Sequence, residues 1–363
     1  MFTDPFFGTA KKRYTLQWLL SAAGVRFILL IILLLANRIS LSAQQKYQVK
    51  IICPQPEATS IRGLATTSDS AIWVSGTKGK VGRSLDDGSS WEWFMPDPNC
   101  DSCDFRSLHA FNRNTAVVIR IGQPAKAYLT QDGGKSWTNT LTIDTAGIFI
   151  DGLTISKNGE GYAIGDPLPD TTGQLRFVML QTHHGKQWQT ITGPIAANGE
   201  AIFAASNTSL ILLPDGTPCF VTGGSKSAIY KKKGLNWNAY TLPVIQGESG
   251  TGAFSVAFRD QQNGIVVGGN YKSDTLRDRN CFLTTDGGKT WKPARTAPSG
   301  YKSCVTWLNK NMVITTGTSG TDISLNGGQD WQTIGKGFNV STKAVYGNKI
   351  FLAGKEIAVI TVE

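Results

Sequence analysis

Two arginines and a lysine occupy one position in a short motif that recurs along the chain. In chain order the seven copies place Arg62, Arg106, Asp151, Phe203, Ser255, Ser303 and Lys343 at this position. Equivalent positions of repeated strands point the same way, so these side chains are expected to share one orientation. Guanidinium groups bind carboxylate or phosphate in a bidentate manner. The pattern predicts an anion-binding sector made by Arg62, Arg106 and Lys343. A ring of internally paired charges, for example Arg106 with Asp151, is the alternative.

A second set of residues has the chemistry of a glycan-active enzyme. Glycosidases use two carboxylates, or in sialidase-like enzymes a tyrosine with an acid partner. The candidates are Asp151, Asp166, Glu200, Tyr271 and Tyr301. Loop residues that only satisfy nearby backbone groups have the same composition, so the sequence favours that simpler interpretation.

Cys100 and Cys103 form a C-x-x-C motif. Reactive dithiols of this spacing begin a helix, which lowers the thiol pKa. Here the motif lies in a loop between Asp97 and Asp104, and these acids would raise that pKa. The sequence therefore favours a loop disulfide or two free thiols over redox catalysis.

Metal and cofactor chemistry have little support in the composition. The chain has only three histidines, and its glycines form neither a P-loop nor a dinucleotide fingerprint. The formal net charge is +10, and it falls to +6 if residues 1–43 are removed. No basic run is longer than 231–233, so no nucleic-acid partner is expected. From the histidine count and the glycine patterns, no metal and no cofactor is expected either.

The elements that would hold these residues follow from an internal repeat, Ser/Thr-x-Asp-x-Gly-x-x-Trp. It is complete around Asp86, Asp132 and Asp286, and Asn326 replaces the acid in a fourth copy. Trp91, Trp137, Trp291 and Trp331 end these four copies, and two decayed copies keep only Gly and Trp. This is the Asp-box, or BNR repeat. Its Asp accepts backbone N–H bonds in a tight turn, so these acids are predicted to be structural rather than catalytic.

Each repeat supplies four short strands, and the six tryptophans recur every 40 to 54 residues. That spacing is typical of β-propeller blades. Blade 4 is predicted to begin with the strand around Phe203. After Trp331 the chain provides three more strands (341–347, 349–354 and 357–362), and the fourth is available at 46–52. The fold class is therefore an all-β, seven-bladed propeller whose ring the N-terminal strand closes in the last blade. Residues 44–363 are predicted to form this one domain.

The N-terminus resembles an export signal. Basic residues 11–13 precede an apolar stretch over 16–36 whose uninterrupted part, 27–36, is short for a membrane span. Residues 1–43 are predicted to be a signal peptide cleaved before Gln44, which places the protein in the periplasm or outside the cell. An uncleaved anchor is the alternative, and it would be the protein's only membrane attachment.

Several short segments of the sequence together resemble a known group of proteins. They are SIRGLA (60–65), DFRSLHAF (104–111), GDP (165–167), GEAIFAASNTS (199–209), GAFSVAFRD (252–260), GGNY (268–271), GYKSC (300–304) and GTSGTDISLNGGQDW (317–331). The chain looks like exported bacterial BNR-repeat propellers, which are similar to photosystem II stability and assembly factor propellers within the sialidase-like superfamily.

The resemblance implies a non-enzymatic protein that binds a partner chain through an arginine patch, and Arg62 and Arg106 match such positions. The arginine triad and RIP-type start of sialidases are not matched, since this chain has Ile61-Arg62-Gly63. The leading expectation is a non-catalytic binding or assembly propeller for a protein or peptide in the cell envelope, with Arg62, Arg106, Lys343, Asp151, Ser255 and Ser303 on its binding face. A glycan-active enzyme is the second expectation, and an oxidoreductase acting through Cys100 and Cys103 is the third.

Overall fold

The computed structural model describes residues 25–31 and 47–362, which belong to two separate units. Residues 25–31 form a helix. Among the described residues, no helix is long and apolar enough to cross a membrane. Most of the predicted signal segment, including its cleavage site before Gln44, lies outside the described residues.

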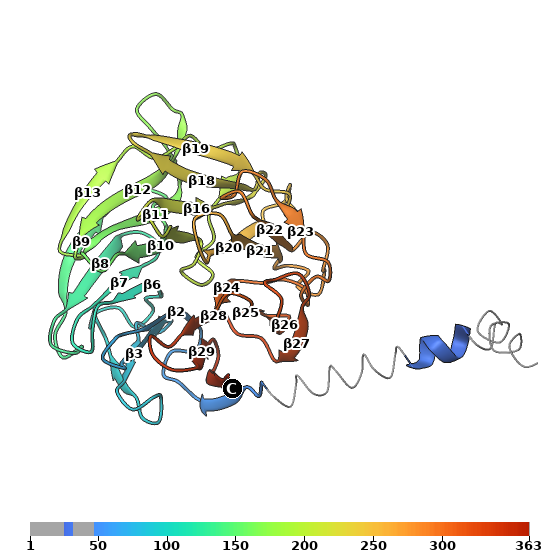
Figure 1. Cartoon of the computed structure of the whole chain (residues 1–363). Coiled ribbons are helices and arrows are strands. Elements are labelled where there is room, and N and C mark those ends of the chain that lie inside the picture. The colour runs from blue at the N-terminus through green and yellow to red at the C-terminus, as the bar shows by residue number, and fades with distance from the viewer. Residues whose placement is uncertain (1–24, 32–46, 363) are drawn as a thin grey trace, which may run out of the picture. The chain divides into compact units, whose positions relative to one another are not determined.

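The second unit is an all-β, seven-bladed propeller (Figure 1). Its innermost strands are β2, β6, β10, β15, β20, β24 and β28, and each contacts the next around the ring until β28 meets β2. Apolar side chains between adjacent blades form the core, and most strand positions that face a neighbouring sheet are buried. The predicted fold class is confirmed.

The strands are short and antiparallel within every blade. Blades 1 and 2 contain β2 (Ile61–Thr66), β3 (Ile72–Gly76), β4 (Val81–Ser84), β5 (Glu92–Phe94), β6 (Phe105–Ala110), β7 (Ala116–Arg120), β8 (Ala125–Thr130) and β9 (Thr138–Ile143). Blades 3 and 4 contain β10 (Ile150–Ile155), β11 (Glu160–Pro169), β12 (Leu175–His183), β13 (Gln187–Ile191), β15 (Leu210–Leu212), β16 (Pro218–Val221), β18 (Ala228–Lys233) and β19 (Asn236–Thr241).

The remaining strands complete the ring. Blade 5 contains β20 (Thr251–Phe258), β21 (Gly264–Asn270), β22 (Cys281–Thr284) and β23 (Lys292–Pro293), and its sheet is extended by β17 (Gly223–Gly224) and β14 (Glu200–Ala201). Blades 6 and 7 contain β24 (Cys304–Trp307), β25 (Val313–Gly317), β26 (Gly320–Ser324), β27 (Gln332–Gly335), β28 (Val340–Lys343), β29 (Lys349–Ala353), β30 (Ile357–Thr361) and β1 (Lys50–Cys53).

The N-terminal strand closes the ring as predicted. β1 pairs with β30, with Lys50 opposite Val359 and Ile51 opposite Ala358. The first strand of the unit therefore supplies the outermost strand of the last blade. Pairing the first and last strands of this unit in one sheet leaves no open seam in the circle of blades.

The repeated turns have the hydrogen bonds that their residues suggest. Asp86 Oδ1 accepts the backbone N–H of Ser90 at 2.8 Å, and Ser84 Oγ accepts the N–H of Gly88 at 2.8 Å. Trp91 Nε1 donates to the Gly88 carbonyl. The same contacts recur around Asp132 and Asp286, and Asn326 Oδ1 accepts the N–H of Asp330. These hydrogen bonds lower the pKa of Asp86 and Asp132 to about 2.

The prediction for the start of blade 4 was wrong. Phe203 does not lie on an inner strand, because blade 4 begins with β15 at Leu210. Residues 202–209 instead cross the centre of the ring, where Figure 1 shows a yellow-green loop. This channel segment (202–209) is mostly buried and bonds to five blades through its side chains and carbonyls. The regular spacing of the tryptophans did not reveal it, because the inner strand β15 is only three residues long and the segment occupies the positions where a longer strand was expected.

Asn207 is the main polar anchor of the channel segment. Its Oδ1 accepts the N–H of Leu153 at 2.8 Å, and its Nδ2 donates to the Leu108 carbonyl at 3.0 Å. It also has a φ of 61°, which asparagine tolerates better than most residues.

Asn207→Ala is expected to lower the free energy of unfolding by about 1–3 kcal/mol. The substitution leaves backbone groups of two blades without their partner. Equilibrium denaturation of the variant checks this, with Asn236→Ala on exposed β19 as the control. Equal stability of the two variants would show that Asn207 does not tie the blades together.

Candidate functional site

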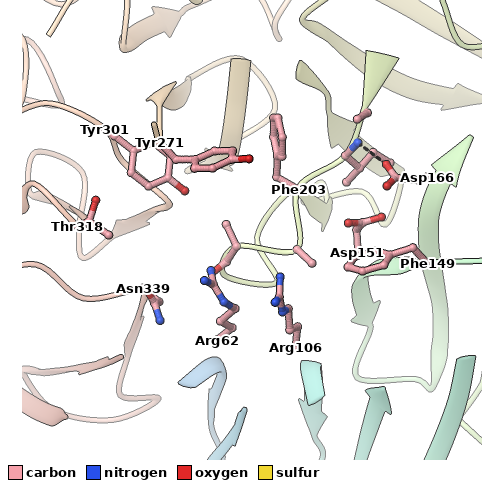
Figure 2. Close-up of a pocket in the computed structure, with 14 residues that line it drawn as sticks. Arg62, Arg106, Phe149, Asp151, Asp166, Phe203, Tyr271, Tyr301, Thr318 and Asn339 are labelled. Atoms are coloured by element: carbon pink, nitrogen blue, oxygen red, sulfur yellow. Dashed lines mark hydrogen bonds between the residues drawn. The ribbon is translucent and has the colours of Figure 1, made fainter. Parts of the chain in front are cut away.

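A pocket of about 460 Å³ opens at one mouth of the central channel. Figure 2 shows that it is ringed by side chains from several blades. Residues 201–205, which include the start of the channel segment, form part of its wall. Because that segment crosses the ring, the pocket is a blind recess rather than the entrance to a pore. Its volume lies in the range usual for ligand pockets.

Three of the predicted site residues reach the pocket through the same backbone irregularity. Strands β2, β6 and β10 each carry a one-residue register shift, at Arg62, Arg106 and Asp151 respectively. A β-bulge leaves one residue outside the regular pairing and redirects its side chain. All three side chains line the pocket. Neighbouring blades therefore present Arg, Arg and Asp side by side, as Figure 2 shows.

The two guanidinium groups differ in their protein partners. Arg106 Nε donates to Asp104 Oδ2 at 2.7 Å. Arg62 Nη1 donates to the Ala205 carbonyl of the channel segment at 3.0 Å. Among the described residues, no carboxylate oxygen lies within 4.0 Å of an Arg62 guanidinium nitrogen. Burial, together with the charge of Arg106, lowers the pKa of Arg62. Within the described chain only Arg106 has a carboxylate partner, so N–H donors of Arg62 stay available for an anionic ligand.

The acids Asp151 and Asp166 lie together on another side of the pocket (Figure 2). Asp151 is 1% exposed, and its Oδ2 has no hydrogen-bond partner. Asp166 Oδ1 accepts the N–H of Ile202 at 3.0 Å. Burial raises the pKa of both carboxyl groups, and for Asp151 the neighbouring Asp166 raises it further. The predicted alternative of an Arg106–Asp151 ion pair is not what the structure shows, because Arg106 pairs with Asp104.

Aromatic rings form a third side of the pocket. Phe203 stacks on Phe254 with ring centroids 3.8 Å apart, and Phe254 meets Tyr301 edge to face at 4.7 Å. Tyr271 is 48% exposed at the rim, and its ring centroid lies 6.4 Å from that of Tyr301. We call Phe203, Tyr271 and Tyr301, which line the pocket, the aromatic wall; Phe254 is buried and packs against all three. Tyr301 is buried, which raises its pKa.

The motif alignment misplaced Ser255, Ser303 and Lys343. The bulge of β20 falls at Phe254. Ser255 is therefore buried, and its hydroxyl bonds to Thr208. Ser303 is also buried and donates to the Asn339 carbonyl at 2.6 Å.

Lys343 is the last residue of β28, which begins at Val340. It therefore lies three positions beyond the start of its strand, whereas Arg62 lies one position beyond the start of β2. Its Nζ donates to the Leu308 carbonyl, and the side chain lines a different, smaller pocket. Asn339, which precedes β28, lines the main pocket instead.

Glu200 is also absent from the pocket. Its carboxylate is buried and accepts hydrogen bonds from Thr222 Oγ1 at 2.7 Å, Tyr230 OH at 2.8 Å and the N–H of Ala197 at 2.9 Å. These bonds fix the turn that leads into the channel segment. Of the five proposed catalytic residues, Asp151, Asp166, Tyr271 and Tyr301 line the pocket and Glu200 does not.

Cys100 and Cys103 form a disulfide in the loop that precedes β6. The Cys103 carbonyl accepts the N–H of Gly79 at 2.7 Å, which ties this loop to blade 1. The same loop ends at Asp104, the partner of Arg106. The disulfide therefore belongs to the frame around the arginines. In the described part of the chain, no group of three or more His, Cys, Asp or Glu side chains is arranged to hold a metal ion.

Comparison with known proteins supports the fold alone. No protein-family model and no curated protein matches the chain. Among solved structures, it is similar to "YCF48 bound to D1 peptide", with a TM-score of 0.61 and 16% identity over 88% of this chain and 97% of that one. It is also similar to YCF48 from Cyanidioschyzon merolae, with a TM-score of 0.59 and 15% identity over 86% of this chain and 98% of that one. A third similar structure is virginiamycin B lyase from Staphylococcus aureus, with a TM-score of 0.62 and 11% identity over 87% of this chain and 100% of that one.

The buried carboxyl of Asp151 predicts a pH-dependent stability. Because its folded-state pKa is raised, the folded protein binds this proton more tightly than the unfolded chain does. Its ionisation therefore destabilises the fold as pH rises above about 4, the ordinary Asp value.

Asp151→Asn is accordingly expected to raise the melting temperature at about pH 8 and to leave it nearly unchanged at about pH 4. Thermal unfolding at both pH values checks this, with Asp86→Asn as a contrasting variant. The lowered pKa of Asp86 means that its carboxylate stabilises the fold above about pH 4 and loses this effect as pH falls towards 2. An Asp151→Asn variant that is less stable at pH 8 would contradict the assignment.

Proposed function

We propose that this propeller is a non-catalytic binding module that holds a protein or peptide partner by an anionic group. Arg62 and Arg106 are the anion-binding residues, and the aromatic wall contacts the apolar part of the same ligand. The observation that carries the proposal is that, of these two adjacent guanidinium groups, only that of Arg106 has a carboxylate partner in the described chain, in a recess that aromatic side chains also line.

The chemistry of the site favours a carboxylate as the anionic group. An arginine presents several N–H donors in a planar fork, which fits two carboxylate oxygens. Partial burial excludes water and strengthens such bonds. Arg62 uses one donor on Ala205, so other donors stay available.

The blind shape of the pocket restricts what enters it. A strand-like ligand cannot pass through the ring, because the channel segment crosses it. A chain end or a single protruding side chain fits a recess of about 460 Å³. The C-terminus of a peptide carries both a carboxylate and an adjacent apolar side chain, and we propose it as the natural ligand class. The similar YCF48 structure with a bound D1 peptide supports this kind of role for the fold.

We further propose that the protein acts outside the cytoplasm, on a partner in the cell envelope. The basic residues and apolar stretch before residue 44 support export. The Cys100–Cys103 disulfide is consistent with an oxidising compartment.

Affinity capture tests the proposal. Residues 44–363 serve as bait in an envelope extract of the producing cell, beside the Arg62→Ala/Arg106→Ala variant. We expect a partner that the unmodified protein retains and the variant loses. Retention of the same partner by both proteins would place its binding surface elsewhere.

A further inference from the structure

The pocket has two oppositely charged sides. Its charged lining residues are Arg62, Arg106, Asp151 and Asp166, two cations and two acids. Figure 2 shows the guanidinium groups beside each other and the two carboxyl groups beside each other. A peptide carboxylate alone would use only the cationic side.

The two sides do not neutralise each other directly. In the described chain, no nitrogen of Arg62 or Arg106 lies within 4.0 Å of a carboxylate oxygen of Asp151 or Asp166. Arg106 is held instead by Asp104. The protein thus keeps the charges apart inside one recess.

The acidic side has unused bonding capacity. Asp151 is 1% exposed and its Oδ2 lacks any hydrogen-bond partner, although a buried, unpaired carboxylate oxygen is costly. Asp166 uses Oδ1 on the backbone N–H of Ile202. The groups that act on Asp151 are Asp166 of β11, Arg106 of β6 and the backbone N–H groups of Asp166 and Ala204. A donor supplied by a ligand would satisfy the free oxygen.

We infer that Asp151 and Asp166 form a second subsite, which binds a cationic hydrogen-bond donor on the same ligand whose carboxylate binds Arg62 and Arg106. This inference rests on the proposed function and narrows its ligand to a dipolar chain end. A peptide that ends in lysine or arginine has this chemistry, with a free carboxylate and a cationic side chain on one residue. The aromatic wall would contact the aliphatic part of that side chain.

Four N-acetylated tetrapeptides of one sequence separate the two subsites. They end in lysine or in norleucine, and each is made with a free or an amidated C-terminus. Binding to residues 44–363 is measured by titration calorimetry. We expect the free-acid lysine peptide to bind at least about tenfold more tightly than the free-acid norleucine peptide, because it adds a hydrogen bond between charged groups.

A second readout follows from the protons. Burial raises the pKa of both acids, and a bound cation favours their ionised forms. Binding of the lysine peptide at about pH 6 should therefore release protons, seen as a dependence of the measured enthalpy on the buffer's ionisation enthalpy. The norleucine peptide should release fewer.

Asp151→Asn and Asp166→Asn should each reduce the preference for lysine while retaining the requirement for a free carboxylate. Two single variants are used so that the test survives if one does not fold. Equal affinity for lysine and norleucine acids would overturn this inference and leave the proposed function intact. Equal binding of acids and amides, or no binding of any peptide at millimolar concentration, would overturn both.

Discussion

The Arg62→Ala/Arg106→Ala variant is expected to bind carboxylate-ended peptides about 100-fold more weakly than the unmodified protein, or not at all. Each guanidinium would contribute a charge-assisted hydrogen bond of about 1.5–3 kcal/mol in a partly buried recess. The fold should be retained with some loss of stability, because both residues are bulges of inner strands, although Arg62 loses its bond to the Ala205 carbonyl and Arg106 its ion pair with Asp104. Fluorescence anisotropy of labelled peptides that the protein binds provides the measurement.

A matched control removes the effect of net charge. Arg295→Ala/Lys349→Ala also deletes two positive charges, from exposed ion pairs with Asp330 and Asp87. Its affinity should stay within about twofold of the unmodified protein, since long-range charge effects are screened by salt. Raising the salt concentration should lower the peptide affinity of the unmodified protein more than that of the Arg62→Ala/Arg106→Ala variant. Equal losses in both double variants would mean that overall charge, and not the pocket, governs binding.

Asp322→Ala is expected to lower the free energy of unfolding by about 3–5 kcal/mol, because it leaves Lys302 buried without a counter-ion. The two side chains are 0% and 2% exposed, with Lys302 Nζ 2.5 Å from Asp322 Oδ2. Asp322 also accepts hydrogen bonds from Ser299 and Thr333. Burial lowers the pKa of Lys302, which the carboxylate opposes. Denaturant unfolding monitored by circular dichroism measures the loss.

Two further variants make this prediction specific. Lys349→Ala breaks an exposed ion pair with Asp87 and should cost less than about 1 kcal/mol. Lys302→Met in the Asp322→Ala background removes the stranded charge and should recover part of the stability. Because Lys302 follows Tyr301, the single Asp322→Ala variant should also weaken peptide binding through the aromatic wall. A cost for Asp322→Ala no larger than that for Lys349→Ala would contradict the buried-pair account.

The fold was predictable because its signals are local and repeated. Asp86, Asp132 and Asp286 each build the same turn from the same few neighbours, so one pattern counted along the chain gives the blades. The closing strand was also predictable, because the last blade lacked one strand and the N-terminus offered one. The channel segment was not predictable, since Asn207 reaches partners on two other blades and no local pattern encodes such contacts.

The candidate site was predictable only where its geometry is regular. Arg62, Arg106 and Asp151 share one bulge position, and the motif alignment found all three. At Ser255 the alignment was one residue late, because the bulge falls at Phe254. The contribution of Phe203 depends on the channel segment, and the burial of Glu200 depends on Thr222 and Tyr230. Packing between distant segments decides such positions.

We propose that Arg62 and Arg106 recognise a carboxylate at the end of a peptide. The most direct measurement probes residues 44–363 with an array of C-terminal peptides from the producing cell's own exported proteins, each present as a free acid and as an amide. We expect binding to a subset of the free acids, loss of binding to the same peptides as amides, and no binding by the Arg62→Ala/Arg106→Ala variant. Equal binding to acids and amides, or undiminished binding by the variant, would contradict it.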